Sequence, residues 1–320
     1  MISIAATPGR RRALTRDMGL AIVLVIELAL LGWLVPGYLT PYGLLDASRQ
    51  FAESGVIALG MTLIILTGGI DLSVGSLMAL VSVTIGFTFQ AGLPLAAAIL
   101  AGIGVGALGG FLNGLLVTTL KLHALVVTVA TFALYRGIAF AVSKGDAVSR
   151  FPAWFSVFGQ DKLRGIVPAQ LIVFAVLASF ISLLLARSRR GRHLYAIGNN
   201  ELAVRFSGVD VTAAKITVYT LTGVLVGLAG VIYTSRISSA RANAGYGLEL
   251  TVIAMVALGG TRITGGSGSI VGTLLGVLIL AYLQDGLSFA GVKSDWGLIV
   301  TGAFLISAVF LNEIFRKEQV

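Results

Sequence analysis

Few side chains in this 320-residue sequence could carry out covalent or acid–base chemistry. It contains no cysteine, so disulfides, thiolate nucleophiles and thiolate metal sites are excluded. The two histidines, His123 and His193, are about 70 residues apart, which argues against a histidine metal site. The chain also has no Gly-x-x-x-x-Gly-Lys-Ser/Thr phosphate loop and no nucleophile elbow. We therefore expect no catalytic residue, no metal and no cofactor, and an energy source outside this chain.

Asp71 is the acidic side chain whose position could carry a function. An acidic residue at the centre of a membrane helix costs roughly 2.5–3.5 kcal/mol on insertion scales. Asp71 could be a proton or ion site, or it could cap and lock a following helix. Because it stands at the start of an apolar stretch, the sequence favours the capping role.

Glycine is abundant, with 41 residues, and two glycine-rich clusters do not fit an uninterrupted helix. The first covers residues 67–76 and the second residues 259–269; each follows one apolar run and precedes another. They predict two broken segments in two related halves, an arrangement typical of transporters with a pathway at the repeat interface. Ordinary tight turns between hairpin helices are the alternative. The broken-helix motifs comprise Gly68, Gly69, Asp71, Ser73, Gly75, Gly259, Gly260, Gly265 and Gly266.

The composition indicates what positions these clusters. The chain is 57% hydrophobic and 12% charged, whereas soluble domains carry about 25% charged residues. Its apolar runs are continuous and long enough to cross a bilayer, which favours helices over the alternating segments of a barrel. The sequence therefore predicts an all-α, polytopic membrane protein with about ten transmembrane helices.

The predicted spans combine hydropathy with helix-breaking residues. The eighth is too short to cross alone and is expected to continue into a broken, protein-buried segment. Glycines four residues apart, such as Gly106 with Gly110, indicate close helix packing. The spans lie near 19–35, 49–67, 74–90, 95–118, 124–143, 168–186, 213–234, 250–262, 268–284 and 296–313.

The net charge of +9 is distributed unevenly over the loops between these spans. With ten spans both termini lie on one side, and about twice as many basic residues fall on that side as on the other. The positive-inside rule then makes residues 1–17 and 314–320 cytoplasmic tails of a single membrane domain covering residues 1–320. This placement favours membrane orientation over nucleic-acid binding.

Two polar loops are long enough to bind partners. On the cytoplasmic side, residues 187–212 contain a predicted short helix that Asn199 or Asn200 can cap and Gly208 can end. This helix could bind a soluble partner or lie on anionic lipid, and the residues alone favour neither. On the other side, residues 144–167 predict an interfacial helix with an aromatic face at the headgroups, although an external docking surface is an alternative.

Several stretches resemble one known family. The run from Gly60 to Ser76, including Leu66-Thr67-Gly68-Gly69-Ile70-Asp71-Leu72-Ser73, is similar to the signature of ribose-type (monosaccharide) ABC importer permeases. That family also includes autoinducer-2 and rhamnose permeases. Further similar stretches follow in the family's order along nearly the whole chain: Asn113 to Val117, Val127-Thr128, Arg136-Gly137, Gly191 to Val209 and Leu258 to Ser269.

The resemblance implies a permease subunit of the bacterial inner membrane that imports a monosaccharide or sugar-like solute. It implies a pore formed with a second copy or a similar permease, a cytoplasmic ATPase dimer and a periplasmic sugar-binding protein, all surrounded by membrane lipid. It also implies that the 187–212 loop contacts the ATPase, which favours a soluble partner over anionic lipid for this loop. The coupling-loop residues are Gly191, Arg192, Gly198, Asn199, Glu201, Ser207 and Gly208.

Three polar residues in or beside spans could line a pathway, namely Asn113, Thr128 and Gln284, but hydrogen bonding between helices is favoured for each. The main functional alternative is an ion-coupled secondary transporter, which would need an essential acid such as Asp71. A membrane-embedded enzyme is disfavoured by the scarcity of acids and histidines within the spans.

Overall fold

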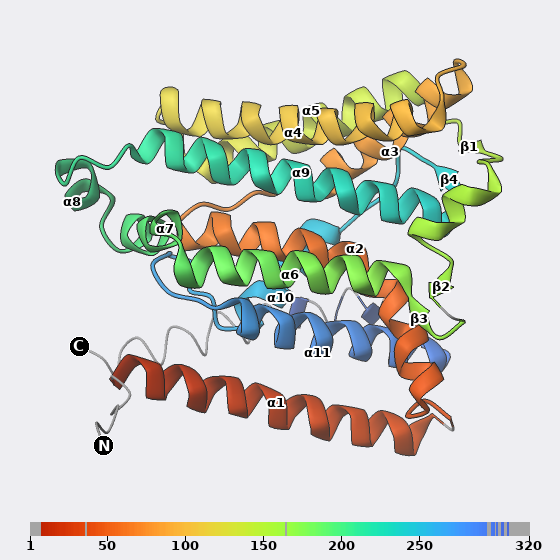
Figure 1. The fold of residues 1–320 in the computed structure, drawn as a ribbon, viewed down its shortest axis with the longest axis horizontal. Helices are drawn as coiled ribbons and strands as arrows, with labels where there is room; N and C mark the ends of the chain where they lie inside the picture. Colours follow the sequence, from red (N-terminus) through yellow and green to blue (C-terminus); the bar gives the residue numbers. More distant parts are fainter. Residues whose placement is uncertain are drawn as a thin grey trace.

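The computed structural model describes residues 8–35, 37–163 and 165–292, with isolated positions 296, 297, 299, 302, 303 and 306. Within these residues every element longer than six residues is an α-helix (Figure 1). The helices are α1 (Pro8–Leu34), α2 (Pro41–Leu66), α3 (Val74–Gln90), α4 (Leu95–Thr119), α5 (Ala124–Ser143), α6 (Ala169–Arg187), α7 (Arg189–Asn199), α8 (Glu201–Phe206), α9 (Val211–Ile237), α10 (Leu248–Leu258) and α11 (Ile270–Phe289). The short elements are the 3-10 helix η1 (Ala153–Phe158) and the strands β1 (Val148–Ser149), β2 (Lys162–Leu163), β3 (Val167–Pro168) and β4 (Ser239–Ala240).

The predicted all-α, polytopic fold is confirmed. Seven helices in the described part of the chain are long and apolar enough to cross a membrane, and α3 and α10 are shorter apolar helices. The eighth predicted span corresponds to α10, which has 11 residues and ends at Leu258, so it is too short to cross alone, as expected. The predicted span 296–313 and the tail 314–320 lie outside the continuously described residues, and the count of ten therefore stays a prediction.

The long helices run side by side and divide the molecule into two ends (Figure 1). The first end, at the left of Figure 1, carries α7, α8 and the N-terminus of α1; we call it the basic end because Arg187, Arg189, Arg190 and Arg192 lie there. The opposite end carries η1 and the four short strands. Helices α7 and α8 of the 187–212 loop thus lie at the same end of the bundle as the start of α1, and the membrane side of this end stays a prediction.

The centre of the bundle is formed by α2, α3 and α9. In the spanning part of α2, 89% of the residues are buried, whereas in that of α1 only 6% are. Helix α1 therefore lies at the periphery, against α11. Glycines allow α4 and α9 to approach closely: a Cβ at Gly106 would lie 2.5 Å from the carbonyl oxygen of Gly223. Small residues hold helices together in lipid in this way, as their spacing predicts.

The loop at residues 144–167 differs from its prediction. Its helix is η1, a single short 3-10 segment, and Phe155 is buried. The Phe155 ring lies against Phe151, which stacks on Phe89 of α3. This aromatic cluster therefore packs mainly on the protein itself, and Trp154 remains half exposed.

Candidate functional site

The first break lies between α2 and α3. Helix α2 ends at Leu66, and Gly68 adopts φ +79°, a left-handed conformation that glycine tolerates best. Asp71 is 2% exposed, and its Oδ1 accepts hydrogen bonds from the Ser73 backbone N (2.8 Å) and the Ser73 hydroxyl (2.7 Å). Asp71 therefore holds the turn before α3 in place, but the N-cap residue of α3 is Ser73 and no side chain caps that helix, so the predicted capping role is not seen.

A buried polar network ties this break to α4 and α5. The Asn113 amide donates to the Ser73 hydroxyl at 2.8 Å and to Asp71 Oδ2 at 3.3 Å. The Tyr135 hydroxyl donates to Asn113 Oδ1 at 3.2 Å, and Thr128 donates to the Ile70 carbonyl at 3.2 Å. Asn113 and Thr128 have no exposed surface. Both therefore bond helices and loop together in this structure rather than face an open cavity.

The second break, residues 259–269, is longer and richer in left-handed glycines. Gly260, Gly265 and Gly266 have φ values of +77°, +91° and +78°. The next helix, α11, starts with a side-chain cap, because Ser269 Oγ accepts from the Gly272 backbone N at 3.0 Å. Helices α10 and α11 then run antiparallel against each other, with Gly259 close to Gly272 and Gly276 close to Met255. Residues 259–269, which we continue to call the second break, are therefore a turn between two hairpin helices, as the alternative predicts.

The two breaks touch at the basic end. The Gly266 backbone N donates to the Leu66 carbonyl at 3.0 Å, so the last turn of α2 is bonded to the second break. A Cβ at Gly265 would lie 2.8 Å from the Gly68 backbone N. The glycines thus permit two irregular backbones to lie in direct contact.

The C-terminus of α7 completes this contact. Gly198 lies so close to the Leu66 carbonyl and the Gly266 N that a Cβ would overlap both. The Asn199 amide donates to the Gly266 carbonyl at 3.0 Å. We call the six residues Leu66, Gly68, Gly198, Asn199, Gly265 and Gly266 the glycine junction. It joins the end of α2, the end of α7 and the second break.

Two further side chains hold the second break. The Tyr195 hydroxyl of α7 donates to the Gly268 carbonyl at 3.0 Å. Arg16 of α1 donates to the Gly260 carbonyl at 2.7 Å and to Ser269 Oγ at 3.3 Å. Sequence reasoning missed both residues, because neither lies in a glycine cluster and their partners are distant in the chain.

Other predicted coupling-loop residues shape α7 and α8. A Cβ at Gly191 would lie 2.5 Å from the Leu185 carbonyl, so glycine permits the sharp turn between α6 and α7. Ser207 donates to the Val204 carbonyl at 2.7 Å, and Gly208, at φ +83°, ends α8. Arg192 is exposed on α7.

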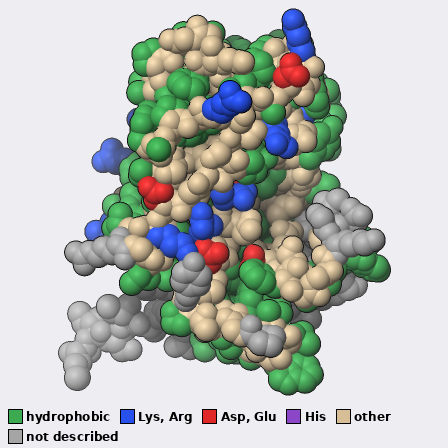
Figure 2. Space-filling view, turned by 90° about the vertical axis from the view of Figure 1, so that its right-hand side faces the viewer, with side chains coloured by type: hydrophobic (Ala, Val, Ile, Leu, Met, Phe, Trp, Pro, Cys, Tyr) green, Lys and Arg blue, Asp and Glu red, His purple; other side chains and the backbone are tan. Residues whose placement is uncertain are grey.

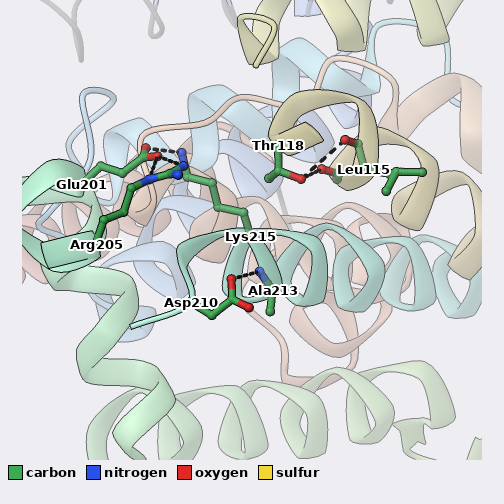
Figure 3. A network of polar contacts seen from close by, with 8 residues as sticks. Leu115, Thr118, Glu201, Arg205, Asp210, Ala213 and Lys215 are labelled. Carbon is green, nitrogen blue, oxygen red and sulfur yellow. Dashed lines mark hydrogen bonds and ion pairs between the residues drawn. The ribbon is translucent and has the colours of Figure 1, made fainter. Parts of the chain in front are cut away.

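Glu201 fastens α8 to α9 (Figure 3). Its carboxylate pairs with Arg205 at 2.8 Å and with Lys215 of α9 at 2.6 Å. Partial burial opposes ionisation, but the hydrogen bonds from Lys215 and Arg205 outweigh it and lower the pKa of Glu201. Asp210 caps α9 beside this network by accepting from the Ala213 N at 2.9 Å (Figure 3).

Helix α8 presents two large apolar side chains to the exterior of the chain. Leu202 is 67% exposed and Phe206 is 86% exposed, and their four-residue spacing places them on one face of the helix. An apolar pair on a polar loop at the basic end is unusual for a surface that faces water alone. The sequence predicts the helix itself from a capping asparagine and Gly208. It gives no indication that Leu202 and Phe206 are the exposed side chains of that helix.

A polar hollow occupies the opposite end. Two adjoining cavities of about 500 Å³ and 360 Å³ share Gln50 and Ser54 of α2, Thr251 of α10 and Gln284 of α11. Figure 2 faces this end, where charged side chains lie among other polar and backbone surface, and hydrophobic side chains gather towards the edges. Of the three predicted pathway residues, Gln284 lines both of these cavities, whereas Asn113 and Thr128 line neither.

The described residues contain no group of three His, Asp or Glu side chains placed to hold a metal ion.

The chain matches the protein family described as "Branched-chain amino acid transport system / permease component" over residues 43–309. It is 42% identical over 300 residues to the ribose import permease protein RbsC of Bacillus subtilis, covering 93% of this chain and 91% of that protein. It is 38% identical over 306 residues to RbsC of Escherichia coli K12, covering 93% of each chain. It is 34% identical over 311 residues to the autoinducer 2 import system permease protein LsrD of Photorhabdus temperata, covering 95% of this chain and 93% of that protein.

Proposed function

This chain belongs to the family described as the permease component of branched-chain amino acid transport systems, and we propose that it imports a monosaccharide or sugar-like solute with energy from a separate ATPase. It is a membrane permease subunit rather than an enzyme. The sugar-like solute follows from the names of its relatives, which are ribose and autoinducer 2 import permeases. The similarity spans nearly the whole length of this chain and of each of these relatives.

The observation that carries the ATP-driven mechanism is the exposed Leu202–Phe206 pair on α8. A partner that buries both side chains would gain the free energy of removing them from water, about 1.5–3 kcal/mol for each fully buried side chain. The Glu201 ion pairs connect α8 to α9, and Gly198 and Asn199 connect the same loop to both breaks. A movement of the bound partner would therefore reach α2 and α11 through direct contacts.

The partners and the orientation belong to the same proposal. The ATPase dimer binds α7 and α8 at the basic end, which lies in the cytoplasm of a bacterial cell together with both termini. A second permease copy or a similar permease completes the pore in the inner membrane. A periplasmic sugar-binding protein delivers the solute to the opposite end, where the polar hollow lies.

Co-purification tests the ATPase contact. A tagged chain expressed with the ATPase of its import system is expected to retain it, whereas Leu202→Asp and Phe206→Asp are expected to reduce retention at least tenfold. Ile166→Asp is the matched control, because Ile166 is 60% exposed but lies at the opposite end. Equal retention by all three variants would contradict docking on α8.

Reconstituted vesicles distinguish ATP-driven import from the ion-coupled alternative. With the ATPase and the binding protein present, uptake of D-ribose is expected to require ATP on the basic side. Uptake driven by a proton or sodium gradient in vesicles that lack any ATPase would overturn the proposal. Asp71, the acid that such coupling would need, is buried and hydrogen-bonded to Ser73 and Asn113.

A further inference from the structure

The hollow at the opposite end is lined by polar groups from three helices, α2, α10 and α11. Gln50 and Ser54 lie one turn apart on α2, Thr251 lies in the first turns of α10, and Gln284 lies near the end of α11. Placing such groups in a membrane-spanning helix is unfavourable unless they meet water or a ligand, so polar residues that line a cavity mark a solute pathway. Their convergence on one space is therefore a feature that needs a function.

The four polar residues that the two cavities share offer uncharged hydrogen-bonding groups. Ser54 donates to the Phe51 carbonyl at 3.0 Å and Thr251 donates to the Gly247 carbonyl at 3.3 Å. Each hydroxyl oxygen keeps lone pairs that can accept from a ligand hydroxyl. The amides of Gln50 and Gln284 each combine donor and acceptor atoms. This set matches a molecule that carries several hydroxyl groups.

Two carboxylates, Glu53 and Asp285, also line the hollow, and both are engaged with protein partners. Glu53 of α2 forms an ion pair with Arg236 of α9 at 2.5 Å, and Arg236 also donates to Gln50 Oε1 at 3.2 Å. The Asp285 carboxylate accepts from the Tyr38 hydroxyl at 3.0 Å. A solute carboxylate placed beside Asp285 would force one of the two carboxyl groups to take up a proton, whereas an uncharged solute meets no such penalty.

The wall of the hollow is held in place from the side of α5. Arg136 is 6% exposed, donates to the carbonyls of Ala242 and Ala244 at 2.7 Å each, and lies 4.5 Å from the ring centroid of Tyr246. These contacts fix residues 241–247, which border the smaller cavity. Arg136 is therefore a positioning residue for the hollow.

We propose that Gln50, Ser54, Thr251 and Gln284 form a binding site for an uncharged, polyhydroxylated solute of monosaccharide size. The inference rests on the proposed import function and assigns the contacts within it. A volume of about 500 Å³ lies within the range of small-molecule sites, roughly 300–1,000 Å³. The same helices, α2 and α11, border the glycine junction at their other ends, so closing or opening of the site can be coupled to it.

Single cysteines test the site, because the natural chain has none. Thr251→Cys and Gln284→Cys are introduced separately into the complete complex and exposed to a membrane-impermeant thiol reagent from the side of the opposite end. With the binding protein and ATP present, D-ribose is expected to slow labelling of both at least fivefold, and D-gluconate is expected to leave it unchanged. Gln90→Cys is the control, since Gln90 is exposed at the same end but lines neither cavity; its labelling is expected to be independent of sugar.

Uptake by alanine variants, which lack the hydrogen-bonding groups of the lining, gives a second readout. Gln50→Ala and Ser54→Ala are expected to lower D-ribose uptake at least tenfold while the ATPase is retained at the natural level, and Gln90→Ala is expected to change neither. Absence of labelling at Thr251→Cys and Gln284→Cys, or labelling that D-ribose, D-xylose, L-rhamnose and D-glucose all fail to slow, would overturn the site. Failure of the proposed import function would appear differently, as loss of ATPase retention by the natural chain.

Discussion

The break at residues 67–73 is held by side chains inside the bundle, whereas the break at residues 259–269 is held largely through its own backbone. In the first, Asp71, Ser73 and Asn113 bond to one another and are almost completely buried. In the second, backbone groups of Gly260 and Gly266 bond to Arg16, Asn199 and Leu66 from three different helices. We therefore expect the first break to keep its conformation during transport. The second break is expected to respond to movements of α1, α2 and α7, the helices that bond to it.

The largest effect is expected where side chains lock the first break. Asp71→Ala removes the acceptor of two short hydrogen bonds and leaves buried donors of Ser73 and Asn113 without it, at about 1–3 kcal/mol for each unsatisfied group. We expect it to lower the free energy of unfolding by about 3 kcal/mol or more, measured by thermal unfolding in detergent. Asp71→Asn, which keeps one carbonyl acceptor, is expected to lose less.

Asp46→Ala is the matched control for Asp71. Asp46 is 41% exposed and pairs with Arg49 and Lys162 near the surface, so its loss is expected to change stability by about 0–1 kcal/mol. If Asp71→Ala unfolded at the same temperature as Asp46→Ala, the first break would not be locked by its side chains.

The second break is expected to respond in transport as well as in stability. Gly265→Ala forces a side chain into a left-handed conformation, at about 1–2 kcal/mol, and brings its Cβ against the Gly68 backbone. We expect D-ribose uptake to fall at least tenfold. Gly92→Ala separates the two causes, because Gly92 has φ +100° but no neighbour within 4 Å; it should keep uptake near the natural rate.

A smaller effect is expected from the side chain that joins α7 to the second break. Asn199→Ala removes one hydrogen bond to the Gly266 carbonyl, worth about 1 kcal/mol. If that bond helps transmit movement, uptake should fall about fivefold with ATPase retention unchanged. Asn199→Asp, which lacks the donor but keeps the shape, should behave similarly; natural uptake by both variants would remove Asn199 from the pathway.

The smallest effect is expected from the ion pairs of Glu201. Because the folded protein lowers the pKa of Glu201, its stabilising contribution is present above the ordinary glutamate pKa of about 4.3 and disappears as the pH falls through the lower, folded value. Glu201 and Arg205 are both more than one third exposed, so solvent reduces the contribution to below about 1 kcal/mol.

The contribution of the Glu201 ion pairs is measured by comparing the free energy of unfolding of Glu201→Gln with that of the natural chain from pH 7 to pH 3. The two curves should differ slightly at pH 7 and converge at the acid end. A difference that grows as the pH falls would contradict the assigned direction.

Much of the helical framework could be predicted from hydropathy and breakers. The predicted spans 74–90 and 124–143 coincide with α3 and α5. The span predicted for α2 begins at residue 49, eight residues late, because the charged residues Asp46 and Arg49 are more typical of a loop than of a membrane span. In the structure the helix starts at Pro41, and the Thr40 hydroxyl caps it by accepting from the Gly43 N. Local capping chemistry therefore decides this boundary where polarity misleads.

The candidate site was only partly visible in the sequence. Gly198, Gly265 and Gly266 stand out individually as helix-breaking residues, but their contacts with Leu66 and Gly68 depend on how distant segments pack. The sequence places Asn113 and Thr128 within spans in either role, and their hydrogen bonds to Ser73 and Ile70 become visible only in the fold. Leu202 and Phe206 have the four-residue spacing of any apolar helix face. The sequence alone therefore could not show that both side chains are exposed.

The central claim is that a partner on α8 acts on the solute hollow through the glycine junction. In vesicles that carry the permease, with the binding protein and an excess of the ATPase supplied, the labelling rate of Thr251→Cys is measured with and without ATP, alone and combined with Phe206→Asp. We predict that ATP changes the rate at least threefold and that Phe206→Asp abolishes the change while the ATP-free rate stays the same. An ATP-dependent change that persists in the Phe206→Asp variant would contradict the claim.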